Sequence, residues 1–425
     1  MGKETKETKE TGRRSWGWMA LVVLALGIGG WYGYTRWQAA QLERQALAAF
    51  RQGELLRGQN RLEEAAASYQ QAVDLKPGYS QAWSNLGVVS AAREQYREAA
   101  TYFEQALVLD PGLFDARIGL AISKGSLGEF PEAEANYQKA IALRPDFAEI
   151  YYNLGFLYQQ QGLYEAALAQ YEKAVQLKPD FVPALANLGQ VHDLRHNPGE
   201  AVAVYQRVLA ISPREGPVYL RLGNSYMDMA DYGAAKTAYQ QAVELGVQSG
   251  RLFHDLGVIS QQEGNLEVAK NYYRRAIQLD TTYAETFYRL GSVMDKLGEG
   301  MQAAALYFHT LRLDPDHASA YYNLAQLYLK QGRQEEGRQI MSIFQQLKEY
   351  ERERKDKAAT MASNPRDPQA AYALGMVHLK YKRYQKARDL FEQALKLSPD
   401  FAPARDRLAE LEGLKPASAA PAAPN

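Results

Sequence analysis

The stretch that decides the fold is residues 148–181, AEIYYNLGFLYQQQGLYEAALAQYEKAVQLKPDF. Its pattern returns along the chain at a constant shift of 34 residues, marked by Pro77, Pro111, Pro145, Pro179 and Pro213. In this register the units begin at Ala46, Ser80, Phe114, Ala148, Val182, Gly216, Gly250, Ala284, Ala318 and, after one interruption, Pro368. A period of this length predicts a repeat array in place of separate globular domains.

Small and aromatic residues recur at fixed positions of each unit. Position 8 is Gly or Ala in all ten units, while position 20 is Ala and position 24 is aromatic in nine of them. The apolar positions have the i, i+3, i+4, i+7 spacing of two amphipathic helices, and the proline at position 32 ends the second helix. Because each helix pair leaves an apolar face uncovered, neighbouring pairs have to stack.

This pattern resembles the tetratricopeptide-repeat family, whose motif is intact at Tyr151-x-x-Leu154-Gly155-x-x-Tyr158. The resemblance covers residues 46–401, most of the chain. It implies an all-α fold, a right-handed superhelical solenoid of about ten helix hairpins. Together with the N-terminal segment described below, we expect this solenoid to be preceded by one transmembrane helix.

The chain is expected to divide into eight segments. They are a disordered cytoplasmic tail (1–14), a transmembrane helix (15–35), a connector (36–45), nine contiguous repeats (46–351), a charged helix extension and hinge (352–367), a tenth repeat (368–401), a capping helix (402–414) and a disordered tail (415–425).

The membrane prediction rests on residues 15–35, which carry no charge and have aromatic residues at both ends. As a helix this segment would be about 31 Å long, enough to cross a hydrocarbon core of about 30 Å. Five Lys and Arg residues precede it and three follow it closely, which favours a cytoplasmic N-terminus. We therefore expect a single-pass membrane protein with its repeat array in the periplasm or otherwise outside the cytoplasm.

Composition argues against catalysis and against cofactors. The 425 residues include no cysteine, and 49 basic residues balance 49 acidic ones, so neither thiolate chemistry nor nucleic-acid binding is expected. His192 and His196 have the i, i+4 spacing of a zinc pair, but His192 occupies a position that is Tyr158 in another repeat, which favours packing. We predict no catalytic residue, no cofactor and no metal ligand.

The resemblance also implies a binding surface. In the family the first helix of each repeat lines a concave groove, in which asparagine can hold the backbone of an extended peptide and apolar neighbours can hold its side chains. The predicted groove residues are Asn85, Val88, Ile118, Ile122, Tyr152, Asn153, Phe156, Asn187 and Asn224. Later repeats place more charge on the same positions, such as Arg251 and Asp255.

The sequence thus predicts a non-catalytic, membrane-anchored scaffold that binds proteins or extended peptides and supports assembly of a membrane or envelope complex. Three alternatives stay open at this point. The chain is a self-oligomerising coat, a cytoplasm-facing regulatory adaptor, or an accessory subunit of a glycosyltransferase or export system. A Gly29-x-x-x-Gly33 pair in the N-terminal segment is the feature that would favour a homo-oligomer.

Overall fold

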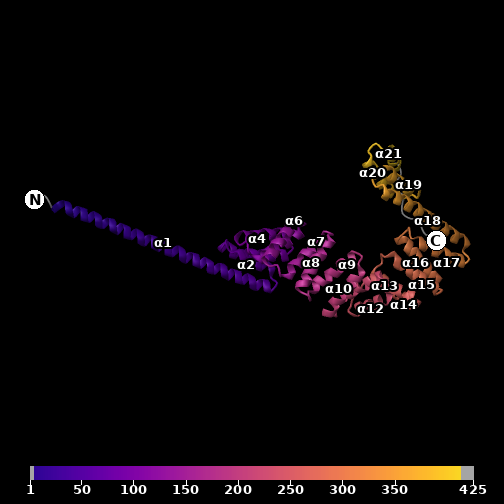
Figure 1. The fold of residues 1–425 in the computed structure, drawn as a ribbon, viewed down its shortest axis with the longest axis horizontal. Coiled ribbons are helices and arrows are strands. Elements are labelled where there is room, and N and C mark those ends of the chain that lie inside the picture. Colours follow the sequence, from indigo (N-terminus) through magenta and orange to yellow (C-terminus); the bar gives the residue numbers. More distant parts are fainter. Residues whose placement is uncertain (1–3, 413–425) are drawn as a thin grey trace. The chain divides into compact units, whose positions relative to one another are not determined.

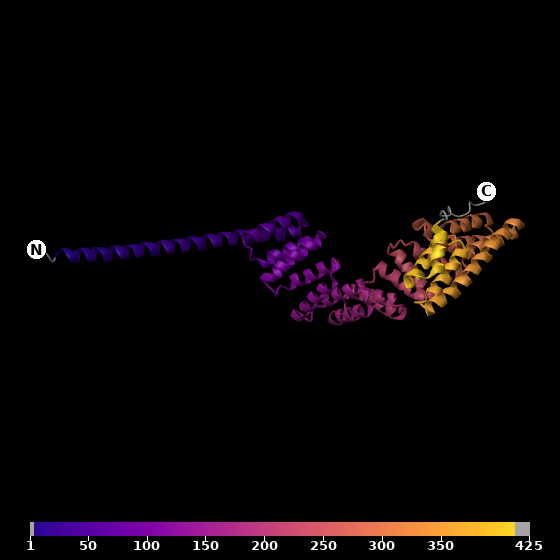
Figure 2. The ribbon, with the colours of Figure 1, turned by 90° about the horizontal axis from the view of Figure 1, so that it is seen from above.

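The computed structural model describes residues 4–412, with side chains described from residue 31 to residue 411. Over this part of the chain all regular structure is helical, in 21 helices. Consecutive helices pair into hairpins, and consecutive hairpins of a unit lie side by side (Figures 1 and 2). This agrees with the all-α helical repeat that the sequence predicts.

The chain divides into two compact units, residues 1–214 and 215–425. Helices of the first are α1 (Glu4–Gly58), α2 (Leu62–Leu75), α3 (Ser80–Ala92), α4 (Tyr96–Leu109), α5 (Phe114–Ser126), α6 (Phe130–Leu143), α7 (Ala148–Gln160), α8 (Tyr164–Leu177), α9 (Val182–Leu194) and α10 (Pro198–Ile211). Those of the second are α11 (Gly216–Asp228), α12 (Tyr232–Glu244), α13 (Gly250–Gln262), α14 (Leu266–Leu279), α15 (Ala284–Lys296), α16 (Gly300–Leu313), α17 (Ala318–Lys330), α18 (Gln334–Ser363), α19 (Pro368–Lys380), α20 (Tyr384–Leu397) and α21 (Ala402–Glu412).

Every hairpin turns at the same repeat position, through a residue in the left-handed region of backbone space. Its φ is +71° at Gly162 and +57° at His196. Glycine adopts this conformation without strain, and other residues adopt it at some cost. The same conformation occurs at Asn60, Glu94, Gly128, Ala230, Gly264, Gly298, Gly332 and Lys382.

In eight of the hairpins an aromatic ring at position 24 packs against a glycine at position 8, whereas the hairpin of α17 and α18 has Met341 at position 24. A Cβ atom added to Gly155 would lie 2.9 Å from Cδ1 of Tyr171, and one added to Gly87 would lie 2.7 Å from Cδ1 of Phe103. Tyr171 is fully buried and Phe103 is almost so. The small residues are therefore required because the ring occupies the space that a side chain would need.

The predicted membrane span is corrected here. Helix α1 does not end at residue 35 but runs without a break to Gly58, and it is the long helix that leaves the first unit in Figure 1. In the part of the chain that the structure describes, no helix combines the length and the apolar character needed to cross a membrane. By that finding the prediction of a transmembrane helix is wrong. The single-pass membrane localisation inferred from it is wrong as well.

The physical reason lies in the composition of α1 from residue 31 onward. This stretch carries Arg36, Glu43, Arg44 and Arg51 within a few turns, so it has no long uncharged run. The side chains of residues 15–30, most of the predicted span, lie outside the described residues. The side chains of the predicted tail at 1–14 also lie outside them. The predicted tail at 415–425 also lies outside the described residues.

Helix α18 is twice as long as the other second helices, with 30 residues. Its first half packs on α17 and its second half on α19. Tyr350, at the middle of α18, is buried, and its hydroxyl lies 3.1 Å from Nδ1 of His378 on α19. The residues that interrupt the 34-residue period therefore lengthen one helix, which covers the first helix of the last repeat.

Candidate peptide-binding groove

The first helices of the hairpins in the first unit carry eight of the nine predicted groove residues. Asn85 and Val88 lie on α3, Ile118 and Ile122 on α5, and Asn187 on α9. The other three, Tyr152, Asn153 and Phe156, lie on α7. Their side chains differ in exposure and in hydrogen bonding, and these differences separate packing residues from residues that are free to bind.

Asn85 is used inside the fold. Its Nδ2 donates to Oε1 of Glu54 at 2.7 Å, and the hydroxyl of the buried Tyr69 donates to the same oxygen. Glu54 belongs to the preceding repeat, so the three side chains tie two repeats together. The Nδ2 donor of Asn85 is therefore already engaged within the fold.

Asn187 has a similar role three hairpins further along. Its Nδ2 donates to the hydroxyl of Tyr171 at 3.3 Å, and this hydroxyl donates to Oε1 of Gln159 at 2.7 Å. Burial of the phenol raises the pKa of Tyr171, so the hydroxyl keeps its proton and acts as a donor. Asn187 is thus mainly a partner for a core tyrosine.

Three of the predicted apolar residues are largely packing residues. Val88 and Ile118 are half-buried and pack against core clusters of their repeats. The ring of Tyr152 lies between those of Tyr171 and Phe181, with centroid distances of 6.0 and 5.3 Å. Aromatic pairs at such distances stabilise the fold beyond the area they bury.

Ile122, Asn153 and Phe156 are the predicted residues of this unit that stay open. Ile122 is 41% exposed and Phe156 is 46% exposed, and both occupy position 9 of adjacent repeats. Among the described residues the half-buried side chain of Asn153 has no hydrogen-bond partner, so its donor and acceptor are available. Exposed apolar side chains and an amide with free donors and acceptors, carried on neighbouring first helices, are what an extended peptide requires. We call these three residues the open triplet.

Asn224 lies in the second unit, on α11, and is described with that unit. Its Oδ1 accepts from the hydroxyl of Tyr239 at 2.9 Å, although the side chain itself is exposed. It therefore resembles Asn187 in its use and does not belong to the open triplet.

The groove positions of the second unit hold a polar network that the sequence alone did not reveal. Oδ2 of Asp255 accepts from Nε of Arg251 at 3.1 Å and from the hydroxyl of Tyr239 at 3.3 Å. Burial raises the pKa of Asp255, and Arg251 opposes that rise. Nη1 of Arg251 also donates to the hydroxyl of Tyr283 at 2.9 Å. One feature of the sequence could have indicated this network. Position 6 of the repeat, which is asparagine in Asn153 and Asn187, is the charged Asp255 here.

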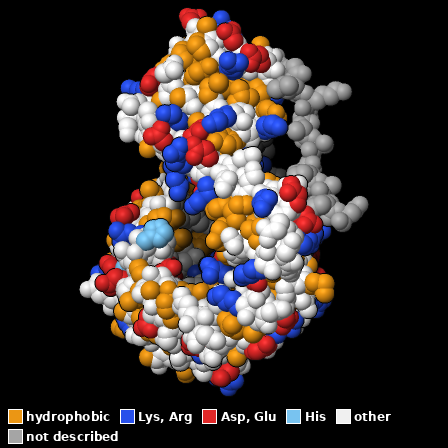
Figure 3. All heavy atoms as spheres, turned by 90° about the vertical axis from the view of Figure 1, so that its right-hand side faces the viewer, with side chains coloured by type: hydrophobic (Ala, Val, Ile, Leu, Met, Phe, Trp, Pro, Cys, Tyr) orange, Lys and Arg blue, Asp and Glu red, His pale blue; other side chains and the backbone are white. Residues whose placement is uncertain are grey.

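A buried histidine lies beside this network. Nδ1 of His254 is 3.0 Å from the hydroxyl of Thr286, and both side chains are almost fully buried. Desolvation lowers the pKa of His254 to about 4, with Arg251 adding to the effect, so the ring is neutral at pH 7. On the face of the molecule in Figure 3, acidic and basic side chains lie close together between apolar patches.

Metal-binding clusters are not found in the described part of the chain. No group of three or more His, Asp or Glu side chains there could hold a metal ion. His196 lies in the turn after α9, whereas His192 lies within that helix, so the two do not form an i, i+4 pair on one helix face. The i, i+4 spacing of the two histidines does not reveal that α9 ends between them.

Models of the tetratricopeptide repeat match most of the array, at residues 50–114, 126–162, 148–181, 184–219, 216–245, 250–283, 306–339 and 368–401. The chain belongs to the tetratricopeptide-repeat family. Tetratricopeptide-repeat proteins are generally non-catalytic scaffolds for protein–protein interaction. No curated protein matches this chain.

Several solved structures are similar to parts of the chain. The C-terminal part of a tetratricopeptide-repeat protein from Cytophaga hutchinsonii is 17% identical, with a TM-score of 0.50, over 57% of this chain and 99% of that chain. PilF of Pseudomonas aeruginosa is 22% identical over 51% and 97%, with a TM-score of 0.44. YrrB, described as having an unusual peptide-binding site, is 19% identical over 56% and 96%, with a TM-score of 0.37. At these identities the similarity concerns the fold alone.

Proposed function

We propose that this tetratricopeptide-repeat protein is a non-catalytic scaffold that binds an extended segment of a protein partner through the first unit, at the open triplet. The observation that carries the proposal is the contrast among predicted groove residues. Asn85 and Asn187 are engaged within the fold, whereas among the described residues Asn153 has no hydrogen-bond partner and shares the first helices α5 and α7 with the exposed side chains of Ile122 and Phe156.

The three side chains divide recognition between them. Ile122 and Phe156 are equivalent positions of neighbouring repeats, so they suit two apolar side chains separated along an extended peptide. Asn153 offers one donor and one acceptor to the peptide backbone between these anchors, which does not depend on the partner's sequence. Selectivity would then come from the apolar side chains and affinity from both contacts.

The test is crosslinking and affinity recovery of partners with a double variant, Ile122→Ser and Phe156→Ser. We expect recovered partners to fall at least tenfold, because two apolar anchors are lost while the exposed positions leave the fold intact. Circular dichroism and the thermal midpoint check that the variant is folded.

A matched control replaces two other exposed apolar residues of the same unit, Val108→Ser and Leu143→Ser. These lie at the ends of α4 and α6, second helices of their hairpins, and are 75% and 46% exposed. Retained recovery in this control, with loss in the groove variant, supports the proposal. Equal recovery in the two double variants would contradict it.

A further inference from the structure

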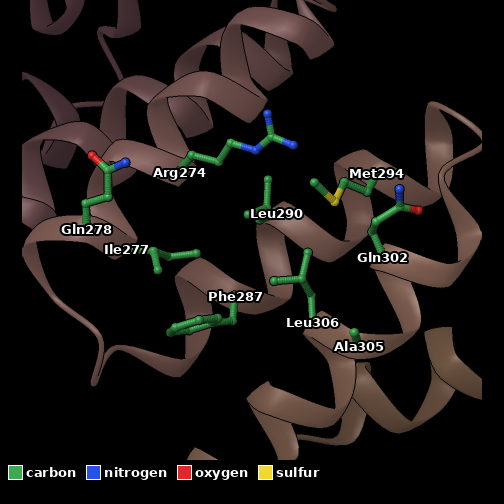
Figure 4. Close-up of a pocket in the computed structure, with 9 residues that line it drawn as sticks. All are labelled: Arg274, Ile277, Gln278, Phe287, Leu290, Met294, Gln302, Ala305 and Leu306. Atoms are coloured by element: carbon green, nitrogen blue, oxygen red, sulfur yellow. The ribbon is translucent and has the colours of Figure 1, made fainter.

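The second unit contains an apolar pocket that the groove does not explain. It has a volume of about 450 Å³, within the range of about 300–1,000 Å³ typical of ligand sites. Its walls come from α14, α15 and α16 (Figure 4). The lining residues are Arg274, Ile277, Gln278, Phe287, Leu290, Met294, Gln302, Ala305 and Leu306.

The pocket lies on a different surface from the groove. Its floor is formed by Phe287, Leu290 and Met294 of α15, the side of that helix which faces the second helices of the hairpins. Groove positions of the same helix, such as Arg289, point elsewhere, since Nε of Arg289 binds Glu285 at 2.6 Å. A ligand here would therefore leave the groove unoccupied.

The chemistry of the pocket combines an apolar floor with one free positive charge. Phe287, Leu290 and Met294 are at most 6% exposed, so the floor is part of the core. Above them the guanidinium of Arg274 reaches over Leu290 and Met294 (Figure 4). Arg274 is exposed, and among the described residues it has no ion-pair or hydrogen-bond partner. Its neighbour Arg275, in contrast, is engaged with Gln278 and Gln248.

We propose that this pocket binds a segment of a partner protein that places a leucine-sized apolar side chain on the floor and an Asp or Glu carboxylate against Arg274. Charge complementarity selects the acidic neighbour, because an unpaired guanidinium prefers a carboxylate. The pocket is open to solvent, so an acyl chain laid in it would stay partly wet. A protein segment covers the opening with its own backbone, which favours it as the occupant.

The probe is a blocked hexapeptide with two leucines flanked by aspartates, compared with a twin in which asparagines replace the aspartates. The full chain, labelled with ¹³C at its methionine methyl groups, reports binding through Met294, assigned with Met294→Leu. We expect the Met294 signal to shift in a saturable way with the acidic peptide, and binding of the asparagine twin to be two- to fivefold weaker, as expected for one exposed ion pair.

Two variants locate the site. Ala305→Phe, at an exposed position that lines the pocket, fills it and should weaken acidic-peptide binding more than tenfold with the fold intact. Arg274→Gln should reduce acidic-peptide affinity two- to fivefold, to that of the asparagine twin. Arg312→Gln removes the same charge from an exposed position of α16 that does not line the pocket and should leave affinity unchanged, which is the matched control.

Three outcomes would overturn the proposal. The first is an unchanged Met294 signal with folded protein and millimolar peptide. The second is equal affinity of the wild-type chain for the acidic and asparagine peptides, which would show that Arg274 does not bind a carboxylate of the peptide. The third is tighter binding of decanoate than of the acidic peptide, which assigns the pocket to an acyl chain. None of these depends on the open triplet, so the two proposals fail separately.

Discussion

At position 6 of its repeat, Asn153 in the first unit has no hydrogen-bond partner among the described residues, whereas Asp255 in the second accepts from both Arg251 and Tyr239. Both residues stand on a first helix, in equivalent places. The difference shows that a groove position is a binding position only when the neighbouring repeat leaves its polar atoms free. A family pattern of groove positions cannot make that distinction, because the tyrosine partners lie 16 residues earlier, on the second helix of the preceding repeat.

The largest expected effect tests what the two units share. Tyr171→Ala and Tyr239→Ala each remove a fully buried ring from between helices, and each should lower the free energy of unfolding by about 3–5 kcal/mol. Chemical denaturation followed by circular dichroism measures this. A much smaller loss in one unit would mean that its hairpins are held by something other than the ring.

The second prediction concerns the pH dependence of stability, to which His254 of the second unit contributes. Because the pKa of His254 is lowered to about 4 in the folded chain, the unfolded chain binds more protons between about pH 4 and about pH 6.5. Stability therefore falls as the pH drops through that window. The contribution is about 2 kcal/mol between pH 7 and pH 5, at 1.36 kcal/mol per unit of pKa.

His254→Gln should remove this part of the pH dependence, since glutamine cannot be protonated in this range. An exposed residue of the same helix provides the control, because Gln262→Asn replaces no titratable group and should leave the slope unchanged. Thermal midpoints of the three proteins at pH 7 and pH 5 make the comparison. An equal slope in wild type and His254→Gln would show that His254 is not the group responsible.

The third prediction compares asparagines within one unit. Asn187→Ala removes a hydrogen bond to the hydroxyl of Tyr171 and should cost about 1 kcal/mol of unfolding free energy. Asn153→Ala removes no bond and should change stability by less than about 0.5 kcal/mol. Equal costs, measured by denaturant titration, would mean that Asn153 has a structural partner and would remove it from the open triplet.

The smallest expected effect concerns the end of the second unit. Nη2 of Arg383, in the turn before α20, pairs with Oδ1 of Asp316, in the turn before α17. Both side chains are about one-third exposed, so Asp316→Asn should cost at most about 1 kcal/mol. Hydrogen exchange of α19 and α20 should become faster, whereas Glu349→Gln, which breaks only the exposed pair with Arg352, should leave it unchanged. Unchanged exchange in Asp316→Asn would show that the ion pair does not hold the last repeat.

Much of the fold was readable from the sequence. The 34-residue period, the glycines and alanines at position 8 and the rings at position 24 predict hairpins that stack, and the structure has them. The prediction of a transmembrane helix was wrong. It rested on the uncharged run at residues 15–35 alone, whereas that run belongs to α1, a helix that continues to Gly58. The groove was predicted only as a set of positions, since position fixes which helix a residue stands on but not which atoms its neighbours already use.

The sequence by itself determined the hairpins, because helix periodicity, the left-handed turn position and the fit of a ring against a small residue are all local properties of one repeat. Only the tertiary structure decided that Asn85 and Asn187 serve core tyrosines while Asn153 stays free, and that α14 and α16 leave a pocket above α15. The physical reason is that hydrogen-bond satisfaction and empty volume depend on atoms brought together from different helices.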